Sequence, residues 1–187
     1  MAKLLTFEAL HPLIQNMIDE GGKLVCLDGR SCAGKSTLAA QLEAQYGCGV
    51  VHMDDFFLPP DKRTSDCNID FVRFRSQVSE QLHLPQLIYD AYNCQSGTSS
   101  PYKASTAPFI LVEGCYSLHP STGLTPDLRL FADISIQEQK QRLLKRNGKE
   151  GYARFSDIWL PREEAYFREF SLPDMCSQPR GENIYLL

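Results

Sequence analysis

A glycine-rich run close behind a short apolar segment constrains the fold more than any other feature of this sequence. Residues 23–28 are typical of a buried strand, and apolar residues at helical spacing follow the run, at Leu38, Ala39, Leu42 and Tyr46. The run matches the phosphate-binding pattern G-x-x-x-x-G-K-[ST] at every fixed position. Its residues are Gly29, Arg30, Ser31, Cys32, Ala33, Gly34, Lys35 and Ser36. A strand, a phosphate-binding loop (P-loop) and a helix are therefore predicted in succession.

The chemistry of such a loop assigns roles to its residues. Glycines let backbone N–H groups turn towards phosphate oxygens, and the N-terminus of the following helix favours negative charge. Lys35 is expected at the β- and γ-phosphates of the ligand, and the Ser36 hydroxyl at Mg²⁺. The predicted nucleotide-binding residues run from Gly29 to Thr37. A chance glycine-rich turn is the alternative, and the matching flanks on both sides argue against it.

Composition narrows the class of protein. A chain of 187 residues predicts a single domain, 1–187, and a formal net charge of −4 without any basic run argues against nucleic-acid binding. No apolar run approaches the ~20 residues of a membrane helix, and the acidic N-terminal segment shows no signal-peptide pattern. The seven cysteines are scattered and show no paired C-x-x-C spacing. We therefore expect a cytoplasmic protein with reduced thiols; the oligomeric state stays unknown.

Apolar segments alternate between strand-like and helix-like patterns along the chain. Expected strands are 23–28, 50–53, 87–89, 109–112 and 130–136, and expected helices are 7–18, 71–82, 138–146 and 161–170. The Ser-, Thr- and Gly-rich segment 93–108 is predicted as a polar loop. Strands that are apolar throughout and alternate with helices indicate a parallel sheet covered on both faces. The predicted fold is a three-layer α/β P-loop NTPase fold, with a parallel five-stranded sheet flanked by helices and a short lid.

Acidic residues stand at the predicted ends of three strands: Asp28, the pair Asp54 and Asp55, and Glu113. Ligands of open parallel sheets bind at the carboxyl ends of the strands. Phosphoryl transfer needs positioned phosphates, a magnesium ion and a group that orients or deprotonates the nucleophile. Asp54 or Asp55 could accept the proton of an acceptor hydroxyl, and Glu113 could hold a magnesium-bound water. Solvated turn residues are the alternative for each of them.

Basic residues follow in the segment 138–154, among them Arg142, Arg146 and Arg154. Most charged helix faces are simply solvated. Gly148 and Gly151 flank part of this segment, and they would permit a lid to close over phosphates. An arginine on such a lid can stabilise the negative charge of the transferred group.

In this order behind the P-loop, several short motifs resemble the uridine kinase family, which includes relatives of the nicotinamide riboside kinases. The resemblance covers about residues 23–154. The motifs are Asp54-Asp55-Phe56-Phe57, Asn68-Ile69-Asp70, Tyr89-Asp90, Val112-Glu113-Gly114 and Arg142 with Arg146.

The resemblance implies a role for each matching residue. Asp54 corresponds to the catalytic aspartate that activates the acceptor hydroxyl, and Glu113 to the carboxylate near the metal. Arg146 corresponds to a catalytic lid arginine that contacts phosphate. The implied substrate-binding residues are Asp54, Phe57, Asp70 at the sugar hydroxyls, Tyr89 near the base, and Arg142.

The resemblance implies ATP and Mg²⁺ as cofactors and a small nucleoside- or sugar-like acceptor with a hydroxyl. Uridine kinases carry a histidine just past the Tyr-Asp pair, whereas this chain continues with Ala91-Tyr92-Asn93-Cys94. The acceptor therefore stays open. Two alternatives remain: an NTPase or nucleotide-binding regulatory protein without an acceptor, and a kinase for a non-nucleoside alcohol such as pantothenate.

Overall fold

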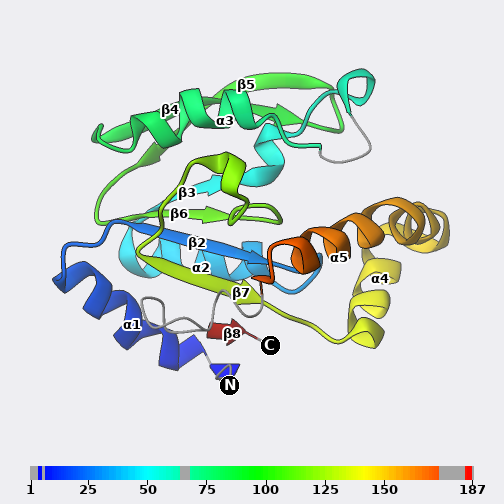
Figure 1. Ribbon diagram of the computed structural model, residues 1–187, viewed down its shortest axis with the longest axis horizontal. Helices are drawn as coiled ribbons and strands as arrows, with labels where there is room; N and C mark the ends of the chain where they lie inside the picture. Colours follow the sequence, from blue (N-terminus) through cyan, green and yellow to red (C-terminus); the bar gives the residue numbers. More distant parts are fainter. Residues whose placement is uncertain (1–3, 6, 64–67, 173–183, 187) are drawn as a thin grey trace.

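A parallel β-sheet forms the centre of the molecule, and helices lie on both of its faces (Figure 1). The computed structural model describes residues 4–5, 7–63, 68–172 and 184–186. Within this sheet, every described strand pairs with its neighbours in parallel. In spatial order the strands are β1 (Leu4–Leu5), β8 (Ile184–Leu186), β7 (Leu128–Ala132), β2 (Leu24–Gly29), β6 (Ile110–Glu113) and β3 (Gly49–His52).

The two faces of the sheet bury different helices, because successive side chains of a strand point to opposite sides. On β2, Val25 and Leu27 pack with α1 (Phe7–Asp19) and α2 (Lys35–Tyr46). Leu24 and Cys26 belong to the cluster on the other face. That cluster contains side chains of α3 (Phe71–Gln77), α5 (Leu160–Glu169) and the hairpin strand β4 (Gln86–Asn93). The result is the predicted three-layer arrangement.

The strand count was wrong. The sheet contains four strands of four to six residues, β7, β2, β6 and β3, and the short strands β8 and β1 extend it at one edge. The expected strand 87–89 belongs to β4, which pairs with β5 (Thr98–Ser105) as a separate antiparallel hairpin. The predicted polar loop 93–108 therefore contains a strand. Most side chains of β5 are exposed, so it lacks the apolar pattern that reveals a buried strand.

The basic segment also differs from the prediction. The strand expected to reach residue 136 ends at Ala132, and the Ser135 hydroxyl accepts from the Glu138 N–H at 3.2 Å as the N-cap of α4 (Ile136–Arg154). The helix was expected to end at Asn147 and Gly148. Instead it continues through a kink at Gly148, whose φ of 70° and ψ of −178° are not helical. A π-helical turn, Phe155–Trp159, then joins α4 to α5.

The described helices do not include one long and apolar enough to cross a lipid bilayer.

Candidate active site

The P-loop follows β2 directly, and α2 begins at its Lys35. Gly29 has a φ of 135°, and a Cβ there would lie 2.0 Å from the Ala132 carbonyl oxygen of β7. Gly34 has a φ of 96° in the left-handed region. Glycine is therefore required where the loop leaves the sheet, because any side chain would collide with β7.

Inside the loop, Lys35 folds back over the backbone. Its Nζ donates to the carbonyl oxygens of Gly29 and Arg30, both at 2.8 Å, and the residue is only 9% exposed. The Arg30 Nε in turn donates to Asp133 at 2.8 Å. The ammonium group therefore lies against the loop, where phosphate oxygens are expected.

Ser36 and Glu113 meet at the start of α2 and the end of β6. The Ser36 hydroxyl donates to a Glu113 carboxylate oxygen at 3.0 Å, and His52 Nδ1 lies 2.6 Å from the same oxygen. This hydrogen bond raises the pKa of His52. A hydroxyl and a carboxylate that face each other fit Mg²⁺, which takes few protein ligands and completes its shell with phosphate oxygens and water. The described residues include no group of three or more acidic, His or Cys side chains that could hold a metal without such a substrate.

Asp54 and Asp55 follow β3 in a short 3₁₀ turn, Met53–Phe56. Asp54 is exposed to the cavity described below, and neighbouring protein atoms partly shield its carboxylate from water. This desolvation, together with the charge of Glu113, raises the pKa of Asp54. Asp55 instead accepts a hydrogen bond of 2.9 Å from the Tyr89 hydroxyl. The two neighbouring carboxylates therefore have different surroundings, and Asp54 makes no side-chain hydrogen bond to the described residues.

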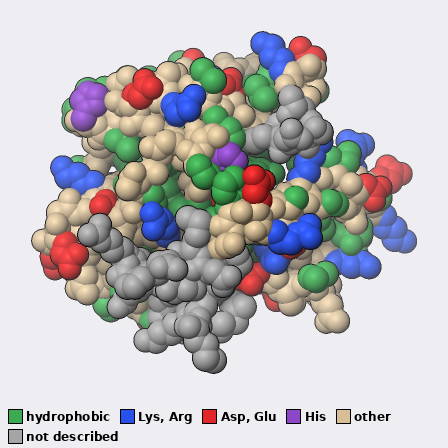
Figure 2. Space-filling model, viewed as in Figure 1, with side chains coloured by type: hydrophobic (Ala, Val, Ile, Leu, Met, Phe, Trp, Pro, Cys, Tyr) green, Lys and Arg blue, Asp and Glu red, His purple; other side chains and the backbone are tan. Residues whose placement is uncertain are grey.

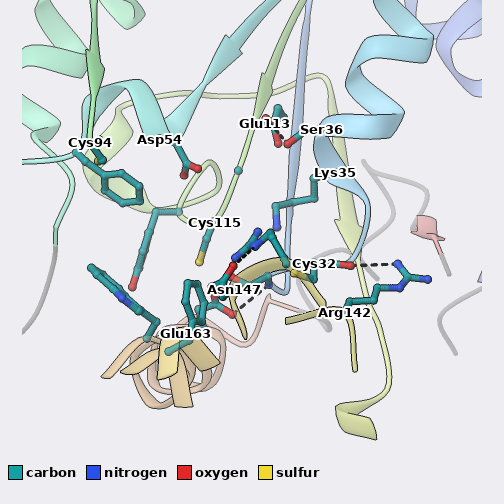
Figure 3. A pocket seen from close by; sticks show the side chains of 18 of the residues that line it. Cys32, Lys35, Ser36, Asp54, Cys94, Glu113, Cys115, Arg142, Asn147 and Glu163 are labelled. Carbon is teal, nitrogen blue, oxygen red and sulfur yellow. Dashed lines mark hydrogen bonds between the residues drawn. The ribbon is translucent and has the colours of Figure 1, made fainter. Parts of the chain in front are cut away.

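A cavity of about 1160 Å³ joins these groups. In Figure 3, Asp54 and Cys94 lie on one side of the cavity, and Lys35 and Ser36 lie on another. Glu163 lines the cavity from α5. The cavity is also lined by three arginines of α4, by Asn147 and by an aromatic group made of Phe57, Phe155 and Trp159. The predicted site residues that line it are Ser31, Cys32, Gly34, Lys35, Ser36, Thr37, Asp54, Phe57, Glu113, Arg142 and Arg146.

The arginines of α4 lie at the same cavity, and Lys and Arg side chains gather at the α4 and α5 end of the molecule (Figure 2). Arg142 Nη1 donates to the Cys32 carbonyl oxygen at 3.1 Å, and its guanidinium also pairs with Glu138. Arg146 donates to the Asn147 side chain at 2.9 Å and lies 5.4 Å from the centre of the Phe155 ring. Arg142 is therefore tied to the P-loop, while Arg146 and Arg154 are exposed at the cavity rim.

Two predicted substrate-binding residues lie away from the cavity. Asp70 caps α3, where it accepts from the Arg73 N–H at 3.0 Å. Tyr89 is 2% exposed and packs against Phe56 and Tyr102, with ring centroids 5.0 and 5.2 Å apart. Neither residue lines the cavity, although the Tyr89 hydroxyl contacts Asp55 at its edge.

Sequence reasoning missed Glu163 on α5. Its carboxylate accepts from the Ser31 N–H at 3.1 Å and from the Ser31 hydroxyl, and Glu164 pairs with Arg30. Glu163 is 6% exposed, and burial raises its pKa. The sequence predicts a helix over this segment, 161–170, but assigns it no role in the site. The available signal was the spacing of Glu163 and Tyr166, because residues three apart share a helix face and both carry polar atoms into the core.

Sequence reasoning also missed the contact between the Tyr166 hydroxyl and Asp28. Asp28 is fully buried and accepts hydrogen bonds from Tyr166 at 2.7 Å, the Gly29 N–H at 2.7 Å and the Leu118 N–H at 3.0 Å. Burial raises the pKa of Asp28, and these hydrogen bonds oppose that effect. Helix α5 is therefore bound to the P-loop at both Asp28 and Ser31.

Comparison with known proteins identifies the fold. No family model matches the chain, and no curated protein matches it. A structure from Bacillus stearothermophilus, provisionally named a uridine kinase, is 19% identical with a TM-score of 0.64, and the match covers 94% of this chain and 98% of that one. A structure from Silicibacter sp. TM1040, provisionally named a fructose transport system kinase, is 24% identical with a TM-score of 0.69, over 86% and 93%. The chain therefore has the α/β P-loop kinase fold, as its resemblance to uridine kinases predicted.

The contact between Glu163 and Ser31 predicts a measurable loss of stability. In Glu163→Ala, two donors of Ser31 lose their acceptor, and we expect the free energy of unfolding in urea to fall by about 1–3 kcal/mol. Glu169→Ala, an exposed position on the same helix, is the matched control and should stay within ±0.5 kcal/mol of the native protein. Equal stability of the two variants would contradict the assigned contact.

Proposed function

We propose that this protein transfers the γ-phosphoryl group of ATP to a hydroxyl of a small acceptor molecule. The observation that carries the proposal is the continuity of the cavity beyond the P-loop. A second hollow of about 450 Å³ shares Asp54, Phe57, Cys94 and Gln95 with the first and extends along the β4–β5 hairpin. A phosphate-binding loop, a carboxylate and space for a second molecule therefore adjoin one another.

The P-loop would hold the phosphates of ATP. Its backbone N–H groups and the start of α2 supply donors and favourable dipole charge, and the Lys35 ammonium offsets the negative charge of the β- and γ-phosphates. Ser36 and Glu113 would hold Mg²⁺, which neutralises charge on the phosphates when it is bound. Arg142 and Arg146 lie where they could contact the transferring group from the side of α4.

Asp54 is the proposed general base. Its raised pKa makes the carboxylate a better proton acceptor than an ordinary aspartate. The acceptor hydroxyl would give its proton to Asp54 while its oxygen bonds to the γ-phosphorus, and the bond from that phosphorus to the ADP oxygen breaks. Atoms and charge balance without a further reactant.

An NTPase without an acceptor would share the P-loop but has no need of the second hollow. The provisional names of both structural neighbours, as kinases, support a kinase in preference to an NTPase. Because Asp70 and Tyr89 lie away from the cavity, the described residues do not favour a nucleoside over another alcohol.

A screen of acceptors with coupled detection of ADP tests the proposal. ADP should form faster in the presence of particular hydroxyl compounds than with ATP alone, and Lys35→Ala should abolish this increase. If no member of a panel of nucleosides, sugars, sugar acids and pantothenate raises the rate of ADP formation, the NTPase alternative is favoured.

Asp54 and Asp55 provide matched variants that test which carboxylate is the general base. Asp54→Asn should retain ATP binding yet lower kcat by roughly a hundredfold or more, because a general base is lost. Asp55→Asn should lower kcat less, because Asp55 contacts Tyr89. The measurement is steady-state turnover with saturating acceptor. A larger loss in Asp55→Asn would assign the base to Asp55 instead.

Arg146 of α4 offers a separate test. Arg146 is exposed at the cavity rim just before the kink at Gly148, and we expect it to reach the phosphoryl group only in the complete complex. We expect Arg146→Ala to lower kcat much more than it raises the KM for ATP. The exposed Lys145→Ala serves as control. A change confined to the KM for ATP would make Arg146 a ground-state contact.

A further inference from the structure

One arginine of the cavity, Arg63, has no role in the proposed chemistry. It follows the short turn Pro60–Lys62 and lines the cavity together with Phe57, Cys94 and Gln95. The last three residues also line the second hollow, where the acceptor is proposed to bind. Arg63 therefore lies at the acceptor end of the cavity, away from the P-loop in sequence and in contacts.

The side chain of Arg63 is held in place before any ligand arrives. Its Nε donates to the Leu58 carbonyl oxygen at 2.8 Å. Its guanidinium carbon lies 6.0 Å from the centre of the Phe57 ring and 5.9 Å from that of Trp159. These two rings are themselves 6.2 Å apart, so the guanidinium lies against an aromatic pair. A group fixed in this way loses little conformational entropy when it binds a ligand.

The charge of Arg63 is not neutralised by the part of the chain that the structure describes. Arg30 pairs with Asp133 and Glu164, and Arg142 pairs with Glu138, whereas no described carboxylate pairs with Arg63. The remaining contact of Arg63, from Nη2 to the Cys94 sulfur, is 3.8 Å long and involves a weak acceptor. The guanidinium thus keeps donors for a carboxylate or phosphate group, to which its planar fork is suited.

We propose that Arg63 binds an acidic group of the acceptor, so that the substrates of this enzyme are small alcohols that carry a carboxylate or a phosphate. The inference rests on the proposed kinase function and specifies its substrate class. The carboxylates of Asp54 and Asp55 adjoin the same hollow and would repel an anion. A fixed cation at its edge offsets this repulsion and orients the acceptor with its hydroxyl towards Asp54.

Trp159, the only tryptophan of the chain, offers a direct measurement. The full-length protein is saturated with ADP and Mg²⁺, so that the P-loop is occupied, and Trp159 fluorescence is then titrated with matched probes. The pairs are pantothenate with pantothenol, and fructose 6-phosphate with fructose. The acidic member of at least one pair should bind at least about tenfold more tightly than the neutral one, and the pair shows whether carboxylate or phosphate is preferred.

Variants at Arg63 separate its charge from its shape. Arg63→Gln should weaken binding of the acidic probe about tenfold or more and remove the preference over its neutral partner. Arg63→Lys should restore only part of the preference, because lysine keeps the charge but not the fork. Lys62→Gln, an exposed neighbour outside the cavity, should bind as the native protein does. Thermal unfolding of each variant confirms that it is folded.

The inference is overturned if acidic and neutral probes bind equally to the native protein, or if Arg63→Gln keeps the preference. Turnover is measured separately on the same panel. If the enzyme phosphorylates neutral acceptors and Arg63→Gln does not change that rate, the inference is overturned and the proposed kinase function is supported. Arg63-dependent binding without any ATP-dependent phosphorylation would instead support the anion site and count against the proposed function.

Discussion

The rest of the site depends on the hydrogen bonds that one buried carboxylate, Asp28, accepts. A charge in the interior is costly unless several hydrogen bonds satisfy it. The donors to Asp28 come from three separate parts of the chain: Gly29 of the P-loop, Leu118 beyond β6, and Tyr166 of α5. Because each donor is needed to satisfy the buried group, the start of the P-loop is fixed to the sheet and to the C-terminal helix at once.

Further contacts extend this attachment around the loop. Glu163 of α5 accepts from Ser31, the Gln139 side chain of α4 donates to the Ser31 carbonyl oxygen at 3.1 Å, and Arg142 donates to that of Cys32. The phosphate-binding loop is therefore held by both helices; α4 also supplies three arginines of the cavity, and the π-helical turn between the two helices supplies Phe155 and Trp159. A movement of α4 or α5 would change the loop and the acceptor end of the cavity together.

The sequence allowed the centre of the molecule to be predicted, because its patterns are local. The P-loop pattern with its apolar flank determined where β2 ends and α2 begins, and the α/β class followed from apolar strands that alternate with helices. The β4–β5 hairpin was not predicted as such, because β5 is mostly exposed. The sequence predicted that the helix ends near Gly148, whereas the structure has a kink there. Glycine is common both at helix ends and at kinks, so its presence does not distinguish the two. Glu163 and Arg63 could not be assigned, because their partners Ser31 and Trp159 are distant in sequence and only tertiary packing brings them together.

The proposed function requires that phosphate passes from ATP to an acceptor and not to water. Transfer of label from ATP carrying ³²P in the γ-position tests it most directly, with an acceptor that raises ADP release and with Lys35→Ala as the inactive control. A kinase should place the label in an acid-stable phosphate ester of the acceptor, in equal amount to the ADP formed. Label found only in inorganic phosphate would contradict it.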